Sequence, residues 1–240
     1  MDAELVNKLL EINRTFYSQF GEAFSDTRSS ERLNIEPFQK YLANNIRLLD
    51  VGCGNGRLAH TLETAGYSLD YIGVDASSRL IARAQDDRVT LRHIHAQFRL
   101  ADLTTPNWSK SVQDTAPFDV IIALAVFHHI PSFELRVQVL SELRTLLKPN
   151  GIFIMSNWQF TQNERLQKKI VPWNTLGIDP ARLEDGDALI DWKRGGIGYR
   201  YVHLLQPTKV EQLARASNFI VLNQFYADAD MNLFSILQSQ

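Results

Sequence analysis

Residues 48–56 read Leu48-Leu49-Asp50-Val51-Gly52-Cys53-Gly54-Asn55-Gly56 and decide the fold class of this 240-residue chain. A short apolar run ends in a turn with three glycines, and an amphipathic stretch follows at about 55–65. A strand that leads through such a turn into a helix is the unit with which α/β domains bind nucleotides. Glycines in the turn allow the backbone to approach a ligand closely.

Strand-like and helix-like segments alternate along most of the chain. Apolar runs predict strands at 46–51, 71–74, 91–100, 120–125 and 152–155. Apolar residues at helical spacing predict helices at about 55–65, 78–85, 133–147 and 209–216. This alternation indicates a mostly parallel sheet with helices on both faces. The last two strands, at about 219–226 and 233–237, have no helix between them, which predicts an antiparallel hairpin at the sheet edge.

The N-terminal residues predict a helical segment that precedes this alternation. One apolar stripe of a helix is formed by Leu5, Leu9, Ile12, Phe16 and Phe20. The stretch 24–28 predicts a loop, and 35–42 predicts a second amphipathic piece.

Composition and charge exclude several classes of protein. The chain is 45% hydrophobic and 22% charged, which excludes disordered and fibrous proteins. Its 27 acidic and 25 basic residues give a net charge of -2, so no overall basic field points to nucleic acid. A local basic patch is compatible with this balance, and Lys168-Lys169 and Lys193-Arg194 are the best candidates for phosphate contacts.

Cysteine content and hydropathy predict a cytoplasmic location. Cys53 is the single cysteine, which excludes an intrachain disulfide and favours a reducing compartment. The N-terminal residues lack the apolar stretch of a signal peptide. The longest apolar run, from Val120 to Phe127, is too short to span a bilayer, so we expect no membrane partner.

Three aspartates at predicted strand ends accompany the glycine turn. A pyrophosphate-binding turn prefers a third glycine where this chain has Arg57, so a dinucleotide is not the favoured ligand. Asp75 stands nineteen residues after Gly56, a distance that suits a carboxylate accepting from both hydroxyls of a ribose. Asp102 is placed to accept from an adenine amino group, and Asp50 to face an ammonium group. Taken alone, Asp50 and Asp102 are better explained as helix caps or turn formers, but the three aspartates together with the glycine turn favour a nucleoside site.

The segment 50–56 resembles the first motif of class I S-adenosylmethionine-dependent methyltransferases. Asp75, the stretch 101–103 and the strand from Phe118 follow in that family's order, and the resemblance covers about 46–157. It implies a Rossmann-like seven-stranded sheet, mostly parallel with the last strand antiparallel, and S-adenosylmethionine as cofactor. The cofactor-binding residues that it implies or favours are Asp50, Gly52, Gly54, Asn55, Asp75, Ala76, Asp102, Leu103 and Leu124.

Four further segments are similar to the eukaryotic methyltransferases that esterify the carboxymethyl group of wobble uridine in transfer RNA. These segments are 24–28, 125–130, 157–158 and 200–203. The resemblance implies a transfer RNA acceptor and a small activating subunit. We expect one methyltransferase domain over 1–240, with an N-terminal helical cap at 1–45 and an insertion at 158–206 as a lid over the acceptor site.

The chemistry of a carboxylate acceptor explains several residues of these segments. A carboxylate is ionised at neutral pH and needs no general base, so catalysis is mostly positioning and exclusion of water. A fork-shaped cation should hold the carboxylate, and Arg28 and Arg200 are the candidates. Tyr17 and His203 complete the predicted catalytic set. Two more aromatic side chains are candidates to orient the acceptor or stack on a base, namely Tyr201 and Trp158.

Other interpretations of the same residues stay open. His128-His129 is better explained as a turn before Pro131 than as catalytic, and no third ligand at metal spacing accompanies the pair, so we predict no metal site. One alternative function is a small-molecule O- or N-methyltransferase that acts on a carboxylic acid. Another is a regulatory protein that binds the cofactor without turnover.

Overall fold

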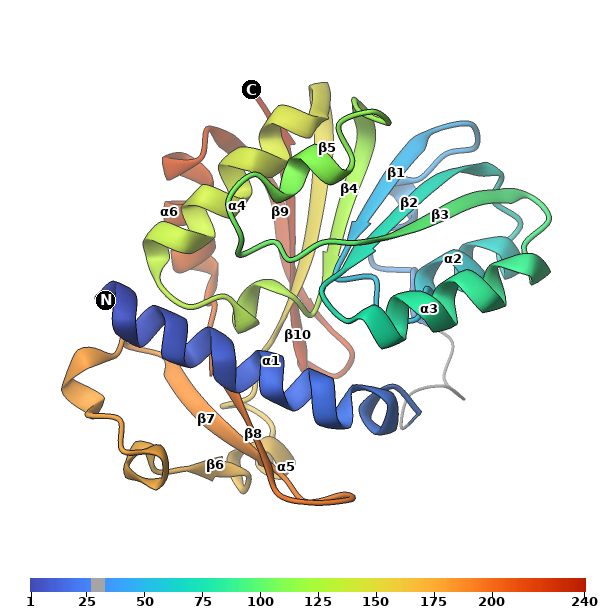
Figure 1. Ribbon diagram of the computed structural model, residues 1–240. Coiled ribbons are helices and arrows are strands. Elements are labelled where there is room, and N and C mark those ends of the chain that lie inside the picture. Colours follow the sequence, from blue (N-terminus) through green and yellow to red (C-terminus); the bar gives the residue numbers. More distant parts are fainter. Residues whose placement is uncertain (27–32) are drawn as a thin grey trace.

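The computed structural model describes residues 1–26 and 33–240 as a large sheet with helices on both faces and a small second sheet (Figure 1). The strands of the large sheet are β1 (Arg47–Val51), β2 (Leu69–Asp75), β3 (Ile94–Leu100), β4 (Phe118–Leu124), β5 (Leu147–Trp158), β9 (Phe219–Ala227) and β10 (Asn232–Ser239). The α-helices are α1 (Ala3–Asp26), α2 (Arg57–Thr64), α3 (Ser78–Asp87), α4 (Phe133–Leu146), α5 (Glu164–Gln167) and α6 (Pro207–Ala216). The small sheet consists of β6 (Ile170–Val171), β7 (Asp187–Trp192) and β8 (Gly198–His203).

The large sheet has seven strands in the order β3-β2-β1-β4-β5-β10-β9. The pairs β1–β2, β2–β3, β1–β4 and β4–β5 are parallel, while β10 is antiparallel to both β5 and β9. This topology confirms the predicted sheet and its terminal hairpin. The strand order reverses at β1 and β4, and open α/β sheets bind ligands in the crevice at the carboxyl ends of such strands.

Both faces of the large sheet are buried, which explains the continuous apolar runs in its sequence. Side chains alternate along β1, so that Leu49 joins the core under α4 and α6 while Leu48 joins the core under α2 and α3. The Ser132 side chain accepts from the amide of Leu135 and so caps the N-terminus of α4.

One N-terminal prediction was wrong. Phe24 lies inside α1 rather than in a loop, because the helix continues through Gly21. A Cβ atom at Gly21 would lie 4.0 Å from Leu80 Cδ1 of α3, which is an ordinary contact distance, so the packing of α1 on α3 does not require glycine there. The expected amphipathic piece at 35–42 contains a 3-10 turn, Gln39–Tyr41, and its apolar residues Ile35, Tyr41 and Leu42 pack against the core.

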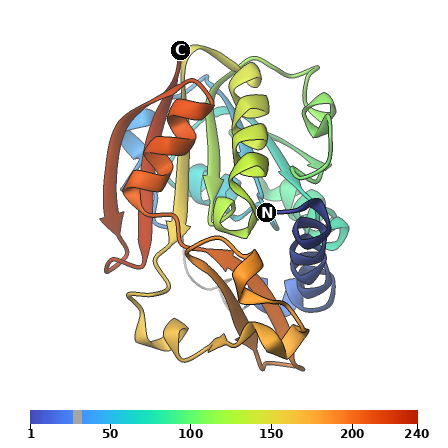
Figure 2. The same ribbon diagram turned by 90° about the vertical axis from the view of Figure 1, so that its left-hand side faces the viewer.

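The insertion at 158–206 folds into the small sheet, which lies below the large sheet in both views (Figure 1 and Figure 2). Helix α1 packs against β8, where the amide of Tyr201 donates to Asn13 Oδ1 over 2.9 Å. Leu5 and Leu9 of α1 share an apolar cluster with Tyr201. The N-terminal helix and the insertion therefore stabilise each other. None of the described helices combines the length and apolar character needed to cross a membrane.

The packing of α4 gives a prediction for folding. Leu140 is fully buried between α4 and the sheet, whereas Leu222 on β9 is 45% exposed. We expect Leu140→Ala to lower the free energy of unfolding by about 2 to 5 kcal/mol because it removes buried contacts and leaves a cavity. Leu222→Ala is the matched control and should change it by less than about 1 kcal/mol. Urea unfolding measures both, and equal losses would contradict the assignment of the core.

Candidate functional site

The glycine turn after β1 has a backbone that only glycine adopts easily. Gly52, Gly54 and Gly56 have φ angles of 73°, 56° and 79°, all in the left-handed region. A Cβ atom on Gly52 would lie 2.4 Å from Val126 Cγ2, which is too close for any side chain. The amide of Gly52 donates to the Val74 carbonyl over 2.8 Å, so the turn is anchored to β2.

The Asp75 carboxylate connects the glycine turn to the end of β2. Its Oδ2 accepts from the Gly54 amide over 3.0 Å, and its Oδ1 accepts from the Ser77 amide over 2.8 Å. Burial raises the pKa of Asp75, the two amide hydrogen bonds lower it, and the charge of Asp102 raises it. The two strand ends are therefore held in one fixed arrangement around a carboxylate.

A hollow of about 440 Å³ opens beside this carboxylate. Its lining residues are Ala76, Leu100, Ala101, Asp102, Thr105, Pro106, Asn107, Trp108 and Ser111. At its edge, Arg14 of α1 forms an ion pair with Asp102 over 2.9 Å. The N-terminal helix thus reaches across the strand ends and contacts the hollow.

Asp50 lies deeper, beneath the glycine turn. The Tyr71 hydroxyl donates a hydrogen bond to its carboxylate. Burial raises the pKa of Asp50 to about 7, helped by the charge of Asp75 and opposed by the Tyr71 hydrogen bond. This carboxylate therefore changes its charge near neutral pH.

The structure brings most of the predicted cofactor residues together. The first group is the turn itself with Asp50, Gly52, Gly54, Asn55 and Asp75. Ala76 and Asp102 line the hollow. Leu103 is 9% exposed and belongs to the core on the α4 side, and Leu124 packs against the opposite core at the end of β4.

A second group of side chains surrounds Arg200, which is 2% exposed. Its guanidinium carbon lies 4.7 Å from the Phe16 ring centroid, 5.2 Å from that of Trp158 and 5.9 Å from that of Trp192. Burial lowers the pKa of Arg200, while its hydrogen bond and charge interaction with Tyr17 raise it. Two predicted catalytic residues, Tyr17 and Arg200, are therefore neighbours within an aromatic enclosure.

His129 connects this enclosure to β8. Its Nδ1 lies 3.0 Å from the Tyr201 carbonyl oxygen, which can only accept, so Nδ1 carries the proton. Its Nε2 therefore accepts from the Tyr17 hydroxyl over 2.9 Å. The hydrogen-bond network assigns this tautomer and leaves the Tyr17 oxygen able to accept from Arg200.

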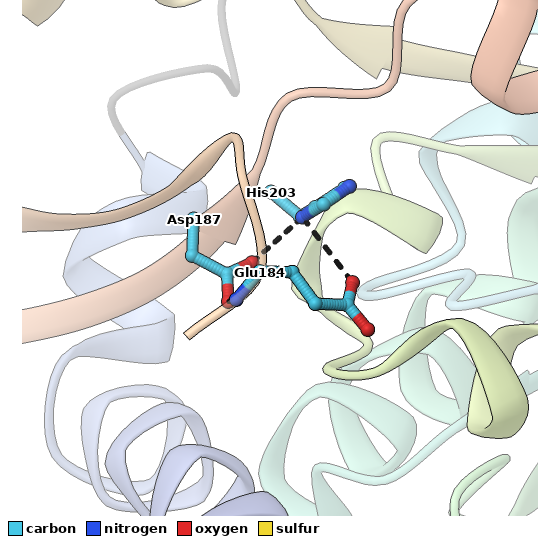
Figure 3. Close-up of side chains that lie close together, drawn as sticks. All are labelled: Glu184, Asp187 and His203. Atoms are coloured by element: carbon cyan, nitrogen blue, oxygen red, sulfur yellow. Dashed lines mark hydrogen bonds and ion pairs between the residues drawn. The ribbon is translucent and has the colours of Figure 1, made fainter. Parts of the chain in front are cut away.

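His203 lies apart from Arg200 and Tyr17, in a cluster with Glu184 and Asp187 (Figure 3). Successive side chains of β8 point to opposite faces, so residues 200 and 203 do not share a face. His203 Nδ1 lies 2.6 Å from an Asp187 oxygen. Burial lowers the pKa of His203, Asp187 raises it, and the charges of Arg136 and Lys209 lower it.

This cluster offers three atoms within 4.8 Å of one another that could ligate a metal. Arg136 already forms an ion pair with Glu184, and Lys209 lies 3.5 Å from His203 Nε2. Arg136 thus pairs with one carboxylate of the cluster and Lys209 lies beside its histidine, and we interpret the cluster as a polar network that joins the insertion to α4 and α6. The prediction that the protein holds no metal stays a prediction.

One predicted catalytic residue lies outside the described structure, and the sequence did not predict several residues of the site. Arg28 lies outside the described residues. Arg14 and Trp192 were not predicted, since an arginine on the polar face of a helix and a tryptophan in an insertion carry no distinctive spacing. The sequence indicates only a turn at His129, and the signal that could have found it is its place in the segment 125–130 that follows β4.

The sequence and fold agree with known proteins. Residues 42–196 match the family model described as "Methyltransferase domain". The chain belongs to this methyltransferase family. This match supports a methyltransferase domain that uses S-adenosylmethionine as cofactor.

Relatives at modest identity include a mouse protein named tRNA (carboxymethyluridine(34)-5-O)-methyltransferase ALKBH8, which is 31% identical over 155 residues. The match covers 63% of this chain but 20% of that protein, so the chain spans about a fifth of its relative's length. Carboxy-S-adenosyl-L-methionine synthase of Nautilia profundicola is 24% identical over 183 residues, or 71% of this chain and 73% of that protein. A solved SAM-dependent methyltransferase from Methanosarcina mazei has the same fold, with a TM-score of 0.64, 18% identity and coverage of 85% of this chain and 96% of that one.

The glycine turn predicts how cofactor affinity responds to substitution. Gly52→Ala should weaken binding of S-adenosylmethionine at least about tenfold, because the added methyl group collides with Val126 and displaces the turn. Gly66→Ala is the matched control, since its φ is also left-handed at 83° but open space surrounds its Cβ position. It should lose stability and keep its affinity. Calorimetric titration measures both, and equal affinities in the two variants would contradict the prediction.

The pKa of Asp50 predicts a pH dependence of binding. If Asp50 faces the ammonium group of the cofactor, as its place at the end of the first strand predicts, only the ionised carboxylate attracts that group, and the pKa of Asp50 is about 7. Affinity of the unsubstituted protein should therefore increase relative to that of Asp50→Asn as the pH rises through this value, over roughly one pH unit on each side. Asp70→Asn, an exposed position on the neighbouring strand β2, serves as control. Parallel pH profiles for the unsubstituted protein and Asp50→Asn would exclude a role for this charge.

Proposed function

We propose that this methyltransferase esterifies a carboxylate, and that its acceptor is the carboxymethyl group of wobble uridine in transfer RNA. The observation that carries the proposal is the buried guanidinium of Arg200 inside its aromatic enclosure. Arginine presents a planar fork of donors that matches the two oxygens of a carboxylate. Attraction between opposite charges is much stronger where water is excluded than at an exposed surface.

The enclosure is connected to the cofactor site through the segment that follows β4. Val126 packs against Gly52 at the beginning of this segment. Two residues later, the His128 ring lies 4.6 Å from the Trp158 ring, which in turn contacts Arg200. An acceptor held by Arg200 would therefore lie beside the carboxyl ends of β4 and β5, next to the glycine turn.

We propose the following roles for the cofactor site. Two features support the fit of S-adenosylmethionine. The glycine turn has no room for a Cβ atom at Gly52, and a hollow adjoins the turn. Asp75 accepts from the ribose hydroxyls, Asp102 from the adenine amino group, and Asp50 attracts the ammonium group. Asp102 also pairs with Arg14, so this helix stays close to the bound nucleoside. When bound, S-adenosylmethionine supplies an electrophilic methyl group on its sulfonium.

The hydrogen bonds of Tyr17 and His129 suit an acceptor that is already ionised. His129 Nε2 accepts from Tyr17, and its Nδ1 donates to the Tyr201 carbonyl, so His129 fixes the orientation of the Tyr17 hydroxyl beside Arg200. A carboxylate has no proton to lose before it attacks the methyl group. The side chains around Arg200 therefore act by orienting the carboxylate and excluding water.

The transfer RNA part of the proposal is supported by relatives such as the mouse protein, at 31% identity. A need for an activating subunit stays a prediction. The alternative acceptor is a small carboxylic acid, and the enclosure of Arg200, at 2% exposure, favours it. The two acceptors differ in whether surfaces outside the enclosure contribute to binding.

Methyl transfer to defined acceptors tests the function. The purified protein and labelled S-adenosylmethionine are incubated with transfer RNA that carries carboxymethyluridine, with the free nucleoside, and with small carboxylic acids. We expect an alkali-labile methyl ester on the transfer RNA, identified by nucleoside analysis. Esters on small acids alone would support the alternative acceptor. No ester above the no-enzyme control with any carboxylate would overturn the proposal.

Arg200 gives the sharpest variant. We expect Arg200→Lys to reduce kcat/KM for the acceptor about 10- to 100-fold, because lysine keeps the charge but loses the bidentate fork. Affinity for S-adenosylmethionine should stay unchanged. Arg182→Lys is the matched control, since Arg182 is exposed and pairs with Asp2. Thermal unfolding verifies that both variants fold, and equal turnover in the two would remove Arg200 from the acceptor site.

A further inference from the structure

We infer that five basic residues beside the acceptor enclosure form a docking surface for the phosphates of an RNA acceptor. This surface, called here the hairpin patch, consists of Arg165, Lys168, Lys169, Lys193 and Arg194. The inference rests on the proposed function, because it names the part of the acceptor that would bind outside the enclosure.

Two separate segments build the hairpin patch. Arg165 lies on α5, and Lys168 and Lys169 connect α5 to β6. Lys193 and Arg194 follow β7 at the turn that leads to β8, and Figure 1 shows this turn close to α5. The Asp191 amide donates to the Lys169 carbonyl over 2.9 Å, which fixes the two segments side by side.

Positive charges are concentrated in the hairpin patch. Burial lowers the pKa of Lys169, and the charges of Arg200, Arg165 and Arg194 lower it further, while Asp191 raises it. Asp191 is itself engaged by Lys193, whose Nζ lies 2.9 Å from its carboxylate. The whole chain has a net charge of -2, so the excess of positive charge in the hairpin patch is confined to one surface. Such a surface attracts polyanions locally.

The hairpin patch is continuous with the acceptor enclosure. Lys169 Nζ lies 5.9 Å from the centre of the Trp192 ring, and the same ring lies 5.9 Å from the Arg200 guanidinium carbon. Positive charge therefore extends from the buried Arg200, past one tryptophan, to side chains at the surface. Arg165, Lys168, Lys193 and Arg194 are exposed and accessible to a large partner.

This arrangement fits a chain of phosphates better than one small anion. Its cations are spread over two segments and do not converge on a single point. A base that inserts its carboxylate toward Arg200 leaves flanking phosphodiesters outside the enclosure, where the hairpin patch lies. Cationic side chains that contact phosphates give affinity that decreases with salt and does not depend on sequence.

Binding of transfer RNA at several salt concentrations tests the inference. The full chain is compared with Arg165→Glu/Arg194→Glu and with Lys40→Glu/Arg215→Glu, a control pair of exposed cations outside the patch. We expect the patch pair to weaken binding at least about tenfold and to reduce the salt slope by about two. The control pair should bind much more tightly than the patch pair. Affinity for S-adenosylmethionine should be unchanged in both.

The outcomes separate this inference from the proposed function. Loss of transfer RNA binding in the patch pair supports the hairpin patch, whether or not a methyl ester forms. Absence of the methyl ester would overturn only the proposed function. Ester formation on transfer RNA with an unchanged KM in the patch pair would overturn only the hairpin patch. No binding by the unsubstituted chain, equal binding by both pairs, or patch-dependent binding to phosphatidylserine vesicles but not to RNA would also overturn it.

Discussion

The hydrogen bond between the Gly54 amide and the Asp75 carboxylate is the constraint on which the site depends. It joins the turn after β1 to the end of β2, and a second amide, that of Ser77, completes the hold on the carboxylate. Because a buried carboxylate needs such donors, the turn can adopt only a small range of positions. The left-handed glycines and the contact of Gly52 with Val126 follow from this arrangement, and they place the segment after β4 beside the turn.

The acceptor side of the site is assembled from segments far apart in the chain. Helix α1 contributes Phe16 and Tyr17, the segment after β4 contributes His129, and β8 contributes Arg200. Asn13 holds α1 to β8 through the amide of Tyr201. Contacts between the N-terminal helix and the insertion therefore determine the shape of the enclosure, while the large sheet determines the position of the glycine turn.

The sequence predicts the two parts of the site unequally. The strand, glycine turn and helix around Gly52 are local, and the spacing of Asp75 after them is short enough to carry a signal. The enclosure depends on contacts between distant segments, which no local pattern records. Arg200 and His203 illustrate this. Their side chains lie on opposite faces because residues 198–203 form a strand, and the sequence analysis predicted no strand there. The loop expected from Phe24 was wrong because α1 continues through Gly21 to Asp26, and a single glycine weakens a long helix without ending it.

Hydrogen exchange of the backbone amides in the presence and absence of S-adenosylmethionine tests the central claim most directly. If the cofactor binds at the turn held by Asp75, saturating cofactor should slow exchange within 52–56 and 75–77 and leave the surface at 165–169 unchanged. Unchanged exchange in the glycine turn, with protection confined to other segments, would contradict the account.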